Sequence, residues 1–163
     1  ESDILQIVHL IDTDGAFIPD NLVKARTEKG IQYFEDHIET GEVKYIQGRN
    51  QKKSSVVASL CSTGKMKSKI PYSIYYFSRN MEHVLHNVAT ELTNDQKVEL
   101  ADAFADRYEE NPMDFVAFVE SEEVAVPGGY TQTWTFIREG TNSLNRHSNL
   151  RILFEQENLK SNQ

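Results

Sequence analysis

The sequence predicts an α/β domain with a central sheet in its first half and mostly helices in its second half. Three observations support this fold class. Two apolar stretches, 4–11 and 72–77, have the length and composition of buried strands. After residue 78, helix-start signals and apolar residues at helical spacing dominate. The length of 163 residues suits one compact domain, expected over 1–154 and followed by a polar, frayed tail at 155–163.

Short elements are expected between the two predicted strands. Pro19 and Asp20 precede a stretch, 21–30, that favours a short helix ending at a glycine. Two runs of mainly apolar residues, 43–46 and 55–60, favour short strands.

The second half begins with a helix entry signal at 78–80, after which apolar residues recur at helical spacing through Leu92. Thr93 followed by Gln96 forms a capping box for a helix over 94–110. Asn111 before Pro112 starts another helix, over 113–121. One more helical stripe contains Tyr130, Trp134 and Ile137, and a final strand is expected over 150–154.

Composition and charge narrow the possible functions. The chain has 25 acidic residues and 17 Lys and Arg residues, a net charge of −8, so nucleic acid is repelled unless a basic patch or a bridging cation is present. No apolar run approaches the roughly 20 residues that span a bilayer, and we expect no membrane contact. The lone Cys61 and the absence of a leader pattern indicate a reducing, cytoplasmic setting. The chain starts without methionine and almost directly in a strand, which we interpret as the loss of an N-terminal strand or segment.

Two acidic residues, Asp12 and Asp14, end the first predicted strand and precede Gly15. Carboxylates one position apart at a strand's carboxyl end can converge on a hard divalent cation. The same residues also suit an ordinary turn, because Asp bonds to nearby backbone and Gly tolerates positive φ. Both interpretations stay open at this point.

The second candidate cluster follows the other predicted strand. Glu82 and His86 are four residues apart and share one helix face, and His83 lies between them. This set can complete a metal site or serve in acid–base chemistry, although a solvated helix face has the same pattern. Zinc is disfavoured because no further ligands are evident.

A basic segment runs from Arg49 to Ile70 without an acidic residue. We expect it to contact a nucleic-acid backbone through Lys52, Lys53, Lys65 and Lys67, although a solvated loop would look the same. Ser62-Thr63-Gly64-Lys65 is not a phosphate loop, because its first glycine is replaced by Ser59 and Met66 follows the lysine.

The motif Asp12-Thr13-Asp14-Gly15 resembles two families. The first is the haloacid-dehalogenase-like phosphatases, whose first strand ends in Asp-x-Asp-Gly-Thr; here Ala16 replaces the threonine. That resemblance implies Asp12 as the nucleophile and Asp14 as the acid. It covers one strand only, because the family's later Gly-Asp-x-x-x-Asp motif is absent.

The second resemblance is to the Toprim-like fold, in particular the RloB-like proteins of bacterial phage-defence and restriction loci. That family couples an Asp-x-Asp strand end to a later strand with a Ser-Asn-Pro-x-Phe-Glu-x-Trp helix entry. Residues 75–86, Tyr-Tyr-Phe-Ser-Arg-Asn-Met-Glu-His-Val-Leu-His, are similar in order and character but lack the Pro and the Phe and Trp anchors. The resemblance spans 4–87 and implies a Rossmann-like sheet and a Mg²⁺ (or Mn²⁺) cofactor. The family's catalytic Glu on an earlier strand has no counterpart here.

We therefore predict a metal-dependent nuclease or phosphotransfer domain acting on nucleic acid, with phage defence as the implied context. Asp12, Asp14 and Glu82 are the expected metal ligands, and His83 or His86 is the expected proton carrier. The alternative is a non-catalytic partner-binding module of a larger defence or mobile-element protein, in which the acids only end a strand. A phosphatase is the third candidate. The choice between DNA and RNA and the oligomeric state are not determined by the sequence.

Overall fold

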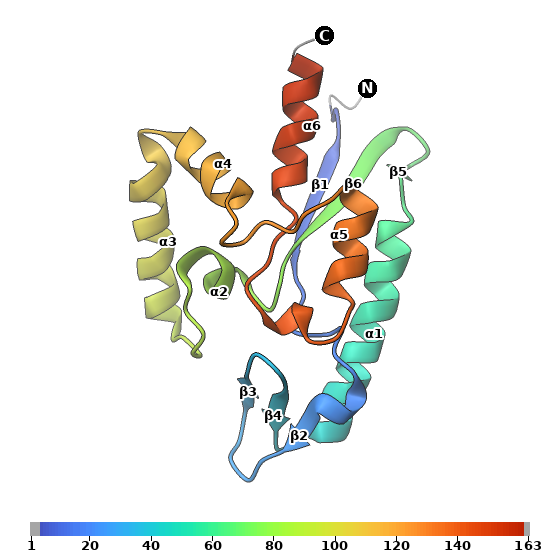
Figure 1. Ribbon diagram of the computed structural model, residues 1–163, viewed down its shortest axis with the longest axis vertical. Helices are drawn as coiled ribbons and strands as arrows, with labels where there is room; N and C mark the ends of the chain where they lie inside the picture. The colour runs from blue at the N-terminus through green and yellow to red at the C-terminus, as the bar shows by residue number, and fades with distance from the viewer. Residues whose placement is uncertain (1–3, 162–163) are drawn as a thin grey trace.

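The computed structural model describes the backbone of residues 4–161 and the side chains of residues 4–156, and its architecture is mixed α/β (Figure 1). The described strands form two small sheets, with the orders β1-β6-β5 and β2-β4-β3. The strands are Ile7–Asp12 (β1), Val23–Ala25 (β2), Ile31–Tyr33 (β3), Ile38–Thr40 (β4), Lys65–Met66 (β5) and Ile70–Phe77 (β6). The α-helices are Val43–Cys61 (α1), Met81–His86 (α2), Asn94–Glu109 (α3), Pro112–Glu120 (α4), Tyr130–Ile137 (α5) and Arg151–Ser161 (α6). Two short 3₁₀ helices, Asp20–Leu22 (η1) and Asn142–Leu144 (η2), complete the described elements.

The parallel pairing of β1 with β6 organises the main sheet. Ile7 lies opposite Tyr72 and Asp12 lies opposite Phe77, so the two strands end side by side. β5 is antiparallel to β6 and pairs only with its first two residues. The carboxyl ends of β1 and β6 therefore share one edge of the sheet, where open α/β sheets bind their ligands.

Alternate side chains of β6 face two different hydrophobic cores. Tyr72, Ile74 and Tyr76 belong to the core formed with α1 and α5, whereas Tyr75 and Phe77 belong to the core formed with α2, α4 and α6. Figure 1 shows these helices on the two sides of the β1–β6 pair. Both faces of β6 are covered, as is usual for a parallel strand. The strand predicted over 72–77 is thus confirmed, with its start at Ile70.

β1 is less buried than its apolar sequence predicts. The side of β1 away from β6 has no strand partner among the described residues. Val8 and Leu10 remain 38% and 41% exposed. The strand prediction over 4–11 is right about the secondary structure and wrong about the burial, because composition does not reveal which strand lies at an edge.

Side chains form hydrogen bonds with backbone groups along the edge of β6 that β5 does not pair with. The Tyr130 hydroxyl donates to the carbonyl of Ile74 at 2.9 Å, and the Ser148 hydroxyl donates to the carbonyl of Tyr76 at 2.8 Å. The Tyr76 amide donates to Oδ1 of Asn149 at 2.9 Å. Because buried backbone groups need partners, these bonds take the place of a neighbouring strand, which the described residues do not supply there.

The largest correction concerns the segment after residue 42. The strands predicted at 43–46 and 55–60 are both parts of the single helix α1. Its buried residues Ile46, Asn50 and Val57 are four and seven positions apart, which places them on one helix face. The apolar runs were too short to distinguish a strand from one face of a long helix.

Three other predicted elements differ from the structure. The helix expected over 21–30 is the short η1 followed by β2. The helix expected to reach Leu92 ends with α2, because Asn87 adopts a left-handed conformation and caps it. The strand expected over 150–154 is instead the first part of the helix α6, which continues to Ser161; residues 162 and 163 of the expected polar tail lie outside the described residues.

The expected helix signals near the middle of the chain are confirmed. Thr93 and Gln96 form the capping box of α3, and Pro112 is the first residue of α4. Among the described residues, no helix combines the length and apolar character needed to cross a membrane.

Replacing Asn149 with Leu is expected to lower the free energy of unfolding by about 1–3 kcal/mol, because the buried Tyr76 amide loses its acceptor. Urea unfolding followed by circular dichroism measures the change. The matched control is Asn94→Leu at an exposed position, where a change of less than about 0.5 kcal/mol is expected. Equal stability of the Asn149 variant and the original protein would contradict the role given to this side chain.

Candidate functional site

Hydrogen bonds between the two chain segments that leave β1 and β6 build the candidate site. The Thr13 amide donates to the carbonyl of Phe77 at 2.9 Å, and the Asp14 amide donates to the carbonyl of Arg79 at 2.7 Å. In return, the Arg79 amide donates to the Thr13 hydroxyl at 2.9 Å. The parallel pairing thus continues past both strands and holds the residues that follow Asp12 against those that precede Glu82.

Thr13 is a site residue that sequence reasoning missed. It is fully buried, and its hydroxyl also donates to the carbonyl of Ser143 at 3.4 Å. The sequence shows only a threonine between the two aspartates. The hydrogen-bond partners of this threonine are 66 and 130 positions away in the chain. Its role was therefore invisible in the local sequence.

The backbone at the site adopts conformations that side chains usually avoid. Asp14 and Arg79 have φ values of 50° and 56°, and Gly15 has φ 64°. A Cβ atom at Gly15 would lie 2.5 Å from Cδ2 of Leu144, so glycine is required there for space as well as for conformation. Non-glycine residues in this region cost of order 1 kcal/mol or more and persist where surrounding contacts hold them.

The surroundings of Asp12 raise the pKa of its carboxyl group to about 6, from an ordinary value of 3.8. Burial of the carboxyl group is the largest cause, followed by the negative charges of Asp14 and Glu82. The positive charge of Lys53 and a hydrogen bond from the backbone amide of Met81 oppose the rise. The charges of Asp14 and Glu82 thus act on Asp12.

Lysines neutralise two of the three carboxylates. The Lys53 ammonium pairs with Asp14, and the Lys97 ammonium lies 3.3 Å from a carboxylate oxygen of Glu82. Asp12 has no ion pair within the described residues. Within that same part of the chain, no three His, Cys, Asp or Glu side chains form a group that could hold a metal ion.

The two candidate proton carriers lie in different surroundings. His83 is buried, and burial together with the charges of Arg79 and Arg146 lowers its pKa to about 4. His86 is partly exposed, with its ring centroid 6.1 Å from that of Phe104. Burial lowers its pKa, and the charge of Glu82 opposes this effect. Of the two, His86 is the more accessible to a reacting group.

The predicted basic segment does not form one surface. Lys52 and Lys53 are on α1. Of these two lysines, only Lys53 forms an ion pair with an acidic residue of the site, Asp14. Lys65 pairs with Pro71 at the start of β6, and Lys67 lies in the turn before that strand. Because the acidic residues follow the end of β6, Lys65 and Lys67 lie at the opposite end of the sheet (Figure 1). The structure does not bring these two lysines to the acidic site.

Arg49, the first residue of that basic segment, contacts the site in a way the sequence did not indicate. Its Nη2 atom donates to the backbone carbonyl of Asp14 at 2.9 Å, and its Nη1 atom donates to the Tyr33 hydroxyl at 3.2 Å. α1 therefore supplies two cations to the turn after β1, with Arg49 on the backbone and Lys53 on the carboxylate.

In comparisons with known proteins, no family model, no curated protein sequence and no solved structure matches this chain significantly. The chemistry of the site therefore has to be inferred from its own residues.

Replacing Asp12 with Asn is expected to stabilise the protein by about 1 kcal/mol at pH 7, where the folded state holds an unfavourable charge. The carboxyl group is only partly buried, so solvent screening reduces the effect. Between pH 4 and 6 the folded state binds a proton that the unfolded state has released, so the free energy of unfolding falls as the pH rises through this window.

Urea unfolding at pH 4 and pH 7 tests this prediction. The advantage of Asp12→Asn should be present at pH 7 and should be mostly lost near pH 4, where Asp12 is protonated in the folded state and about half protonated in the unfolded state. Asp102→Asn on the exposed surface of α3 is the matched control and should show no such dependence. A variant that is less stable at pH 7 would show that burial and repulsion do not destabilise the charged Asp12 carboxylate.

Proposed function

We propose that this protein is a divalent-metal-dependent phosphodiesterase or phosphotransferase acting on nucleic acid, built on a Toprim-like sheet of the RloB-like type. One observation carries the proposal: Asp14 and Glu82, from two different strand exits, are near enough to Asp12 for their charges to add to burial in raising its pKa to about 6. Perturbed carboxyl groups at the carboxyl end of parallel strands favour a functional site over a simple turn.

The donor chemistry at the site fits Mg²⁺ or Mn²⁺. Carboxylate oxygens are the ligands that hard divalent ions take, and an ion between them would relieve the repulsion that raises the Asp12 pKa. The residues do not form a ready group of three ligands in the described structure, and Lys53 pairs with Asp14 and Lys97 with Glu82. Binding would therefore require an exchange of partners at Asp14 or Glu82.

Each side chain then has a distinct role. Asp12 and Asp14 would hold the ion, with Glu82 as the third acidic group; such an ion stabilises negative charge on a phosphoryl group. Lys53, released from Asp14, would hold a phosphate oxygen. His86 would accept or donate the proton. His83, with a pKa of about 4, is neutral at pH 7 and can act there only as an acceptor.

Isothermal titration with Mg²⁺ and with Mn²⁺ tests the metal site. Asp12→Asn is expected to weaken binding at least about tenfold, because it removes a charged ligand. Equal affinities of Asp12→Asn and the original protein would remove the metal site. Retained metal binding without cleavage of a labelled DNA or RNA strand would favour the partner-binding alternative. Hydrolysis of small phosphomonoesters but not of nucleic acid would favour the phosphatase.

Lys53→Gln is expected to change metal affinity and activity in opposite directions. Loss of the Lys53 ion pair frees the Asp14 carboxylate, so Mg²⁺ should bind several-fold more tightly. Cleavage of a labelled strand should nevertheless slow at least tenfold, because a contact to phosphate is lost. The matched control is Lys52→Gln, which is exposed on the same helix and should change neither quantity. Weaker metal binding by Lys53→Gln would contradict the competition between Lys53 and the ion.

A further inference from the structure

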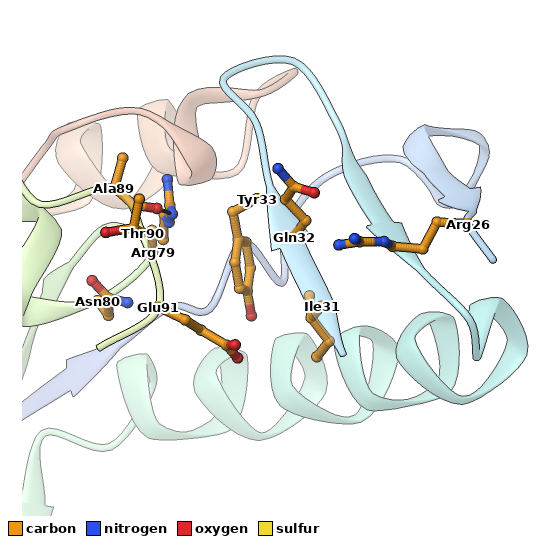
Figure 2. A pocket seen from close by; sticks show the side chains of 9 residues that line it. All are labelled: Arg26, Ile31, Gln32, Tyr33, Arg79, Asn80, Ala89, Thr90 and Glu91. Carbon is orange, nitrogen blue, oxygen red and sulfur yellow. Dashed lines mark hydrogen bonds between the residues drawn. The ribbon is translucent and has the colours of Figure 1, made fainter. Parts of the chain in front are cut away.

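A cavity of about 250 Å³ lies next to the acidic site and takes no part in the function proposed above. Figure 2 shows that it is bounded by β3 on one side and by residues 79–80 and 89–91 on the other. The volume is at or below the small end of the range for ligand pockets, about 300–1,000 Å³. It therefore suits a single small group rather than a large cofactor.

Arg79 is the buried cation of this cavity. Its residue is only 5% exposed, and no carboxylate within the described residues forms an ion pair with it. One guanidinium nitrogen donates to the carbonyl of Ala89, but the buried Nε has no hydrogen-bond partner. Burial also lowers the pKa of the guanidinium. Burying a cation that has no ion-pair partner and an unused hydrogen-bond donor costs folding free energy, unless a bound anion pairs with it.

Tyr33 forms an aromatic wall beside this cation. The guanidinium carbon of Arg79 lies 5.0 Å from the centroid of the Tyr33 ring. The Tyr33 hydroxyl accepts a hydrogen bond from Arg49, which also binds the backbone of Asp14. The cavity is therefore joined to the acidic site through the side chain of Arg49 and through the backbone of Arg79.

We propose that this cavity binds the phosphate of a nucleotide, with Arg79 as its charged ligand and Tyr33 as the surface against which the base lies. This proposal rests on the function proposed above and extends that function, because it assigns a binding site to the nucleotide next to the acidic residues. Arginine donates to phosphate in a fixed fork, and bases stack on aromatic rings and on arginine without regard to sequence.

The other side chains of the cavity fit this assignment. Gln32, Asn80 and Thr90 supply neutral polar groups. Arg26 is already paired with Glu28, so Arg79 is the cation left for an anion. Glu91 also lines the cavity and is exposed, so it can turn towards solvent when an anion enters. A free carboxylate ligand would satisfy Arg79 but would not use the tyrosine ring.

Fluorescence anisotropy with a 3′-labelled single strand of about ten nucleotides, in buffer containing EDTA, tests this site without metal. Arg79→Gln is expected to weaken binding about ten- to hundredfold, because a charge-assisted contact is lost. Thr90→Glu, at an exposed loop position, places a negative charge in the cavity with little risk to folding and should weaken binding about fivefold. Thr131→Glu, the same change at an exposed position of α5 outside the cavity, should have no effect.

Competition experiments with the same probe identify the bound group. Adenosine monophosphate should displace the strand, and adenosine should not. Equal competition by both compounds, or equal binding by Thr90→Glu and Thr131→Glu, would overturn the proposal. Loss of binding in Lys65→Gln or Lys67→Gln but not in Thr90→Glu would place the strand at the other end of the sheet and would also overturn it.

The two proposals fail in different experiments. If Arg79→Gln and Thr90→Glu no longer bind the labelled strand but Asp12→Asn still binds metal like the original protein, the nucleotide site is supported and the metal-dependent chemistry is contradicted. If metal binding depends on Asp12 but the Thr90 and Arg79 variants bind the strand normally, the metal site is supported and the nucleotide site is contradicted.

Discussion

The hydrogen bonds that join the end of β1 to the end of β6 are the constraint on which the rest of the site depends. The Thr13 amide donates to the carbonyl of Phe77, the Arg79 amide donates to the Thr13 hydroxyl, and the Asp14 amide donates to the carbonyl of Arg79. Parallel pairing alone would bring the strand ends together and then let the chains diverge. Because the bonds continue for two residues more, the turn after β1 and the entry to α2 are fixed relative to each other. These segments contain the residues with left-handed backbone, Asp14, Gly15 and Arg79.

That fixed geometry places like charges near one another in a partly buried setting. Together with burial, the resulting cost is expressed in the raised pKa of Asp12, which the charge of Lys53 from α1 opposes; Lys97 from α3 pairs with Glu82. Groups held against their electrostatic preference are typical of binding and catalytic sites. Arg79 contributes on both sides of this arrangement, because its backbone aligns the acidic turn while its side chain enters the neighbouring cavity.

Local signals in the sequence predicted elements well where the signal and its partner are close along the chain. The capping box at Thr93, the proline at the start of α4 and the β-branched and aromatic run of β6 are such cases. Prediction failed for α1, where short apolar runs were read as strands, and for α6, whose first residues were read as a strand. In both segments the identity of the element depends on which side chains pack against other parts of the molecule.

Local patterns were enough to predict the α/β class, the position of Asp12 and Asp14 at a strand end, and the spacing of Glu82 and His86 on one helix face, because each follows from the periodicity of a single element. The burial of Thr13 between the strand exits, and the contacts of Arg49 and Arg79 with the site, follow from tertiary packing. It also separated Lys53 from Lys65 and Lys67. These outcomes depend on contacts between residues far apart in the chain, which no local pattern specifies.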